Sequence, residues 1–375
     1  MAYNRVNPGD EKISKEMLYQ AVESLCLHKY SASLYQKLSK QCEYHIFAMV
    51  DGIQEQVTDF KLQRNYMSYL NVINQFWKTH CEQMNTVRNI FLVLDRTYPQ
   101  QQPNALSIWD LGLQLLRQRL EFHDDILQTL FISLLALIEQ ERHFQSIDID
   151  LMRDVIRMLY ALELYPLFEK IFLEDSVRFF QQLYSNLNCA ESLQYLATVE
   201  KRIAQANEMV VNYMQPSTRS ALLHVIDNYF LLPNLENCIA SGLPLALAHQ
   251  SGQEIKFADV KRMHSLVERV NQIPLLLKHW SDYIKETGGT YIHLNNAQSS
   301  KTADKEFDKT IVENLLTFYE LMEAVLKNCF KSDDQFRGQL RSAFEVCVNK
   351  ASNKIARLLV LHVDSKLRGD LRLCR

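Results

Sequence analysis

Glycine and proline are scarce in this chain of 375 residues, which holds only 9 glycines and 8 prolines. Average usage is roughly 7% and 5%, so both residues are depleted. Tight hairpins need residues that tolerate a positive φ angle, which is the property of glycine. The hydrophobic share is 47% and the charged share 23%, which excludes disorder over most of the length. The composition therefore favours long helices joined by few turns.

Long apolar and basic runs are also lacking. The longest apolar run, residues 129–138, is shorter than the roughly 20 residues that span a bilayer. Residues 1–12 contain no apolar segment of the secretory type. Basic residues number 41 against 44 acidic ones and form no long cluster. We therefore expect neither a membrane nor nucleic acid as a direct partner. The eight cysteines are scattered without a CxxC pair, which is typical of a reducing compartment.

Catalytic and cofactor motifs are absent from the sequence. We find no Gly-rich phosphate loop, no HExxH, no GxSxG and no metal-ligand spacing among the eleven histidines. His123 is followed by Asp124 and Asp125, which could suggest acid–base chemistry. At a predicted helix start, however, paired carboxylates also complement the positive end of the helix dipole, and we favour that interpretation. No catalytic residue, metal or cofactor is expected.

Helical periodicity begins at Ser14. The N-terminal part is predicted to form helices over residues 14–26, 31–50, 66–98, 107–121 and 124–142. Asp51-Gly52 is expected to end the second helix, and Pro99 the third. Ser107 is a predicted N-cap. Helix is expected between sparse breaks in the rest of the chain, apart from the polar segment His293–Lys305.

Two of these helices have more than one organised face. At about 100° per residue, Leu18, Val22 and Leu25 form a core stripe. The face beside it contains Glu16, Tyr19, Gln20 and Glu23, either as a solvated face with an incidental tyrosine or as an interface with an aromatic anchor.

The helix over residues 107–120 has two apolar stripes. Ile108, Leu111 and Leu115 lie on one side. The second stripe consists of Trp109, Leu113, Leu116 and Leu120, about a third of a turn away. This second stripe must pack either against another helix of the same bundle or against a partner protein.

Several segments resemble the cullin family in order along nearly the whole chain. They are residues 18–26 (LYQAVESLC), 87–98 (VRNIFLVLDRTY), 107–113 (SIWDLGL), 137–142 (LIEQER), 195–203, 279–285 (HWSDYIK) and 362–368 (HVDSKLR). The first segment and the one containing Trp280 are most similar to cullin subfamily four. The resemblance implies an all-α, elongated stalk of three stacked five-helix cullin repeats.

The implied organisation has five parts. They are a flexible arm (1–13), repeat one (14–144), repeat two (145–252), repeat three (253–366) and a divergent tail (367–375) that lacks the C-terminal cullin domain. That domain recruits the RING subunit in the family, so this partner is expected only of a full-length chain. The implied location is cytoplasmic and nuclear.

The resemblance also assigns a partner to the two unusual helices. In the family, the matching helices of repeat one bind a substrate adaptor, which for subfamily four is the large damaged-DNA-binding β-propeller protein. The matching residues here are Glu16, Tyr19, Gln20, Glu23, Trp109, Leu113 and Leu116. The implied function is a non-catalytic scaffold of a ubiquitin ligase. Alternatives are a truncated form that sequesters the adaptor, a subunit of a helical tethering complex, or an all-helical enzyme with an unrecognised site.

Overall fold

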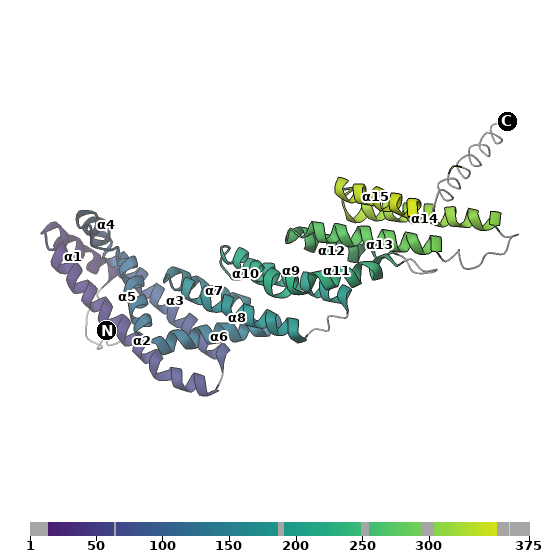
Figure 1. The fold of residues 1–375 in the computed structure, drawn as a ribbon. Coiled ribbons are helices and arrows are strands. Elements are labelled where there is room, and N and C mark those ends of the chain that lie inside the picture. Colours follow the sequence, from purple (N-terminus) through teal and green to yellow (C-terminus); the bar gives the residue numbers. More distant parts are fainter. Residues whose placement is uncertain are drawn as a thin grey trace. The chain divides into compact units, whose positions relative to one another are not determined.

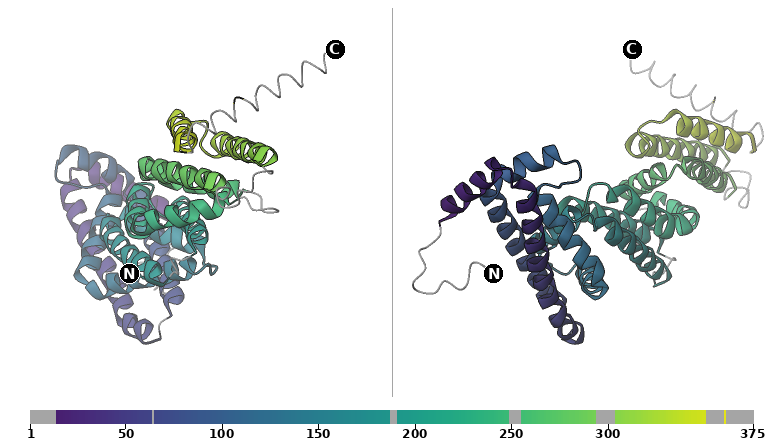
Figure 2. Two further views of the ribbon diagram at one scale, coloured as in Figure 1. Left: turned by 45° about the vertical axis from the view of Figure 1, so that its right-hand side comes forward. Right: turned by 90° about the vertical axis from the view of Figure 1, so that its left-hand side faces the viewer.

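Every regular element that the structure describes is a helix. The computed structural model describes residues 14–63, 65–186, 191–248, 255–293, 304–350 and 360, and no strand occurs in these ranges (Figure 1; Figure 2). The all-α prediction is therefore confirmed. The predicted flexible arm, most of the polar segment His293–Lys305 and the predicted divergent tail lie outside the described residues.

The chain divides into two compact units. The first comprises residues 1–176 and 205–221, and the second comprises residues 177–204 and 222–375. The helices described before residue 227 are, in chain order, α1 (Lys15–Leu27), α2 (Ser31–Gln63), α3 (Tyr66–Ile90), α4 (Leu92–Gln101), α5 (Ile108–Phe122), α6 (Asp124–Arg142), α7 (Ile149–Ala161), α8 (Tyr165–Asn186), α9 (Ser192–Asn212) and α10 (Thr218–Ile226). Each of α8, α9 and α10 contributes residues to both units. The three repeat boundaries stay predictions.

Helix starts in the first unit follow the local chemistry of the sequence. The Ser107 hydroxyl accepts a hydrogen bond from the Asp110 amide at 3.1 Å, which confirms the predicted N-cap of α5. Ser14 caps α1 in the same way, through the Met17 amide at 3.1 Å. Asp124 and Asp125 occupy the first turn of α6, where their charges complement the helix dipole as predicted.

Two predicted helix ends were wrong. α2 continues through Asp51-Gly52 to Gln63, because glycine permits a positive φ angle but does not require it, and Gly52 keeps the helical conformation. The Asp51 carboxylate is bound by Arg119 and His123. The predicted helix over 66–98 is two helices that meet at Phe91, and Pro99 lies inside α4. A proline within the last turns removes one backbone hydrogen bond without ending the helix at once.

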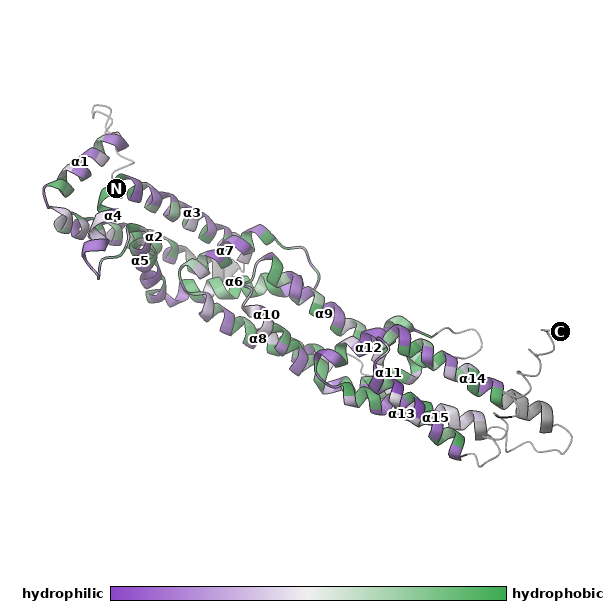
Figure 3. Cartoon of the chain, turned by 90° about the horizontal axis from the view of Figure 1, so that it is seen from above, coloured by the Kyte–Doolittle hydropathy of each residue, from purple (hydrophilic) through white to green (hydrophobic). Residues whose placement is uncertain are grey.

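The helices of the first unit bury one side each. Figure 3 shows hydrophobic and hydrophilic residues on different sides of individual helices. α5 packs against α2, α3 and α6, and α3 also packs against α6 and α7. Gly112 of α5 allows close approach to α3, because a Cβ at this position would lie 2.6 Å from the Met84 methyl group. The core of this unit therefore lies between α2, α3, α5 and α6.

The second unit contains a π-helical segment and five α-helices beyond it. These elements are η1 (Asp227–Leu231), α11 (Leu232–Leu247), α12 (Phe257–Arg269), α13 (Ile273–His293), α14 (Asp304–Cys329) and α15 (Asp334–Lys350). α11 packs against α12 and α13, and α13 packs against α14 and α15. Trp280, Phe330 and Phe336 are fully buried, and the last two rings stack at 4.1 Å. These aromatic rings form the core between α12, α13 and the α14–α15 turn.

The π-helical segment lies directly before Pro233. A proline donates no backbone hydrogen bond, and its ring crowds the carbonyl four residues earlier. The backbone widens here, so that the Leu232 amide donates to the Asp227 carbonyl five residues before it. The Tyr195 hydroxyl donates to the Phe230 carbonyl, and Asp227 binds Arg269 through both carboxylate oxygens, at 2.8 and 3.1 Å. These contacts with α9 and α12 hold the wider turn in place.

Candidate adaptor-binding surface

The outward side of α1 carries the residues predicted for the interface. Glu16, Gln20 and Glu23 are exposed, and Tyr19 is partly buried beside them. The Gln20 side chain donates to the Glu16 carboxylate at 3.5 Å, a long contact on the exposed surface. The structure thus places these four side chains on the accessible part of one helix.

The inner side of α1 differs in one residue from the predicted core stripe. Leu18, Val22 and Cys26 pack on a small cluster around Ile90 and Leu94. Leu25, which was predicted to lie in the core, is 40% exposed. The cluster contacts positions four residues apart, so the stripe passes through Cys26 rather than Leu25.

Two exposed apolar side chains of α1 were missed by the sequence reasoning. Met17 is 57% exposed and Leu27 is 77% exposed, and Tyr30 just beyond the helix is 59% exposed. Their signal in the sequence is that they are apolar at positions out of phase with the core stripe. At 100° per residue Leu27 lies about 80° from Tyr19 around the helix, whereas Met17 lies about 160° away, so only Leu27 adds to the side that carries Tyr19.

The second apolar stripe of α5 is divided by the fold. Trp109 and Leu113 are partly buried and keep some accessible surface. Leu116 is fully buried and Leu120 is 3% exposed. Because α5 packs against three other helices, the far part of this stripe belongs to the core of the unit. Leu116 therefore cannot contact a partner directly, and we leave it out of the surface.

The first turn of α5 is tied to α4 and α2. The Asp95 carboxylate accepts a hydrogen bond from the Ile108 amide at 2.6 Å and one from Arg88 at 3.0 Å. The Tyr35 hydroxyl donates to the Leu106 carbonyl at 2.9 Å, and its ring lies 4.9 Å from that of Tyr98. Burial is the main cause that raises the pKa of Tyr35, so the phenol stays a hydrogen-bond donor.

The last turn of α5 is held by an ionic and aromatic cluster. Asp51 of α2 accepts hydrogen bonds from Arg119 at 2.9 and 2.5 Å and contacts the His123 ring at 3.0 Å. The hydrogen bonds from Arg119 are the largest cause that lowers the pKa of the Asp51 carboxyl. The guanidinium also lies over the rings of Phe47 and Phe122, at 4.8 and 5.1 Å. Both ends of α5 are thus fixed to α2.

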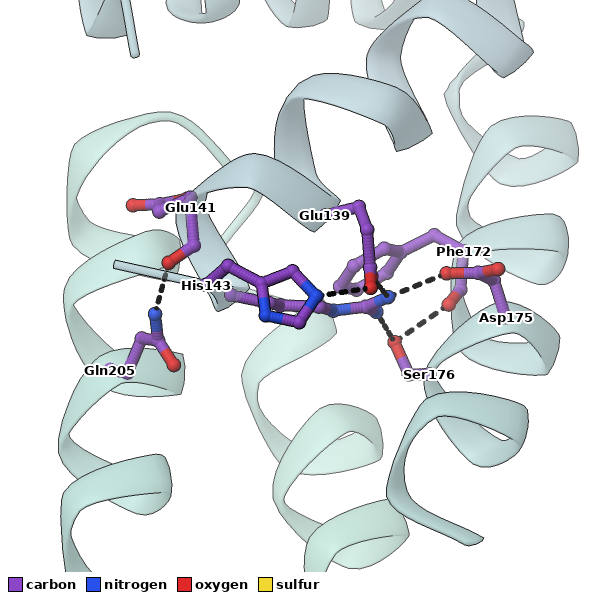
Figure 4. A network of polar contacts seen from close by, with 8 residues as sticks. Glu139, Glu141, His143, Phe172, Asp175, Ser176 and Gln205 are labelled. Atoms are coloured by element: carbon purple, nitrogen blue, oxygen red, sulfur yellow. Dashed lines mark hydrogen bonds and ion pairs between the residues drawn. The ribbon is translucent and has the colours of Figure 1, made fainter. Parts of the chain in front are cut away.

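The end of α6 joins α8 and α9 within the first unit through a polar network (Figure 4). The Arg142 side chain is 5% exposed and binds Asp175 at 2.6 Å and the Ser176 hydroxyl at 2.7 Å. The Glu141 carbonyl accepts a hydrogen bond from Gln205 at 2.6 Å. Since a guanidinium offers several donors in a fixed plane, Arg142 can hold two groups of α8 at once.

The described part of the chain contains neither a side-chain group suited to a metal ion nor a membrane-spanning helix. No three His, Cys, Asp or Glu side chains are grouped there so that they could hold a metal ion. Within the same ranges, no helix combines the length and apolar character that crossing a bilayer requires. In the first unit, the partly buried aromatic residues Tyr19 and Trp109 lie on α1 and α5, two helices that both pack against α2 and α3.

Three related proteins illustrate what the chain is similar to. Human Cullin-4A is 37% identical over 361 residues, which cover 94% of this chain and 44% of that protein. Cullin-4 of Dictyostelium discoideum is 32% identical over 359 residues, covering 95% and 42% respectively. Cullin-3B of Arabidopsis thaliana is 28% identical over 379 residues, covering 98% and 48%.

These similarities extend across both units. The chain spans less than half the length of these curated relatives, and it is more similar to the two Cullin-4 proteins than to Cullin-3B. The family model of the Cullin alpha solenoid domain matches residues 5–373. The helical fold, the order of the matching segments and this match over nearly the full length lead to one conclusion: the chain belongs to the cullin family.

Proposed function

We propose that this chain is the adaptor-binding arm of a ubiquitin ligase scaffold and binds a β-propeller adaptor of the damaged-DNA-binding type. The observation that carries the proposal is the partial exposure of Tyr19 and Trp109, on two helices that both pack against α2 and α3. The greater similarity to Cullin-4 proteins supports the choice of adaptor. The work of such a scaffold takes place in the cytoplasm and the nucleus.

The proposed mechanism is positional and needs no catalytic residue in this chain. A scaffold that holds a substrate near a loaded ubiquitin-carrying enzyme raises the effective concentration of the two reactants. In this proposal the adaptor brings the substrate, and a RING subunit on the rest of the full-length protein brings the enzyme. Rigid helices suit the role, since a flexible arm would lower the effective concentration.

The proposed contact surface has the features of an energetic hot spot. Tyrosine and tryptophan are enriched among residues whose truncation weakens protein complexes most. Leu27 adds exposed apolar area, and Glu16 and Glu23 supply a polar rim that favours a partner with basic residues opposite. Both helices are capped and packed without a partner, so little ordering entropy is lost on binding.

The double variant Tyr19→Ala with Trp109→Ala tests the proposal. We expect adaptor binding to weaken by more than about 2 kcal/mol, or about 30-fold in Kd, because two aromatic anchors are lost. Calorimetric titration with the purified β-propeller adaptor measures the change, and thermal unfolding by circular dichroism checks that the variant is folded. Tyr44→Ala is the matched control, because Tyr44 is 64% exposed on α2 and lies outside the surface. Unchanged affinity of the double variant would refute the proposed function.

A further inference from the structure

The buried carboxylate of Asp95, on α4, contacts the start of α5, one of the two helices of the proposed surface. Its side chain is 4% exposed. One oxygen accepts from the Ile108 amide, which is the first residue of α5 and directly precedes Trp109. This amide belongs to the first turn of the helix, where backbone donors have no partner within the helix itself. The negative charge also complements the positive end of the α5 dipole.

The other side of α4 supports α1. Leu94, the neighbour of Asp95, is fully buried in the cluster on which Leu18 and Val22 of α1 pack. Tyr35 and Tyr98 line the same cluster, and Tyr35 also binds the segment before α5 through the Leu106 carbonyl. One small group of side chains thus contacts both α1 and the start of α5.

We propose that Asp95 is a positioning residue that fixes the first turn of α5, and with it Trp109, relative to α1. This inference rests on the proposed function and adds a residue that never touches the adaptor. Tyr35 of α2 contributes less directly, because its hydroxyl donates to the Leu106 carbonyl in the segment just before α5. Arg88 contributes less, because its side chain is 48% exposed and its contact with the second carboxylate oxygen is partly screened by solvent.

A double-mutant cycle with Trp109 tests the inference. Asp95→Ala is expected to lower adaptor affinity by about tenfold, the scale of a lost hydrogen bond to a charged group. In the Trp109→Ala background the same change is expected to cost less than about threefold, because the side chain that Asp95 positions is gone. Asp95→Asn keeps an acceptor oxygen for the Ile108 amide, and we expect it to restore affinity to within about threefold of the wild type. An equal loss in both backgrounds would overturn the inference.

Amide hydrogen exchange tests the same point without the adaptor. Asp95→Ala is expected to speed exchange over residues 106–111 by about tenfold while exchange in α7 is unchanged. Asp154→Ala is the matched control: Asp154 binds Lys78 at 2.9 Å on the surface of the same unit, away from α5. Unchanged exchange over 106–111 would overturn the inference whatever the adaptor does. If Asp95→Ala does not fold, Asp95→Ser is compared with Asp95→Asn in its place, because the shorter serine side chain cannot reach the Ile108 amide whereas asparagine can. Equal exchange over residues 106–111 in these two variants would equally overturn the inference.

The two proposals fail in different ways. If Trp109→Ala leaves adaptor affinity unchanged, the proposed function is wrong, and the binding role of Asp95 is overturned with it. If Trp109→Ala weakens binding but Asp95→Ala does not, the surface is right and the positioning role of Asp95 is wrong.

Discussion

His80 of α3 stacks on Trp77, one turn earlier on the same helix, with ring centroids 5.9 Å apart. The residue is 2% exposed, and this burial, with a smaller contribution from His45, lowers the pKa of His80 to about 4. An unfolded chain would bind the proton near pH 6.5. His80 therefore makes the stability of the first unit depend on pH in a known direction.

The free energy of unfolding is expected to fall as pH drops from about 6.5 to 4, because the unfolded chain takes up the proton first. The slope for one such group is about 1.4 kcal/mol per pH unit, and the total is on the order of 3 kcal/mol. The variant His80→Gln should show a flatter dependence in urea unfolding at pH 7.5 and pH 5. His28→Gln, at an exposed position, is the control. Identical pH profiles for wild type and His80→Gln would contradict this account.

The substitution Arg142→Ala is expected to lower the free energy of unfolding of the first unit by about 3 kcal/mol, because Asp175 and Ser176 lose a buried charged partner. Arg117→Ala is the comparison. Arg117 pairs with Glu121 and Glu163 but is 35% exposed, so we expect a loss of under about 1 kcal/mol. Urea unfolding followed by circular dichroism measures both. Equal losses for the two arginines would mean that burial does not strengthen the Arg142 contacts.

Adjacent glycines of α13 should respond to alanine in opposite directions. A Cβ on Gly288 would lie 2.8 Å from the Cys347 sulfur of α15, whereas a Cβ on Gly289 would have no atom within 4 Å. We expect Gly288→Ala to destabilise the second unit by about 1 to 2 kcal/mol. Gly289→Ala should stabilise it by about 0.5 kcal/mol, since alanine favours the helix. Thermal unfolding distinguishes the two, and a stabilising Gly288→Ala would refute the close packing.

Leu116 and Leu113 of α5 should separate stability from binding. Leu116→Ala removes a fully buried side chain, so we expect a loss of about 3 kcal/mol in stability. Leu113 is only partly buried, and its truncation should cost less stability but weaken adaptor binding. Parallel unfolding and titration experiments test this division. Direct loss of affinity in a fully folded Leu116→Ala protein would show that the surface reaches deeper than we infer.

Local chemistry made several features predictable from the sequence. The cap at Ser107 depends on a hydroxyl and an amide three residues apart, and the start of α6 depends on two adjacent carboxylates. In both cases the residues that determine the helix start lie within a few positions of it in the sequence. The bounds of α6 and the start of α5 therefore matched the prediction closely.

Features that depend on contacts between residues far apart in the chain could not be predicted from the sequence. Asp51-Gly52 has the composition of a helix stop, yet Asp51 is held by Arg119, 68 residues away. Leu116 and Trp109 fall in one apolar stripe, but the fold buries Leu116 fully and Trp109 only in part. Asp95 gave no signal at all, since its partner is a backbone amide that any residue would supply.

The wider turn of η1 has a consequence for the helix that follows it. One additional residue in a helix rotates everything after it by about 100°. Leu235, Cys238 and Ile239 of α11, which packs against α12 and α13, are buried and follow this turn, so the direction of their side of the helix depends on that rotation. Deleting a single residue between Asp227 and Leu231 would rotate this side by about 100° away from its present packing. In an all-helical protein, rotational phase has the importance that strand register has in a sheet, and here five residues and Pro233 set it.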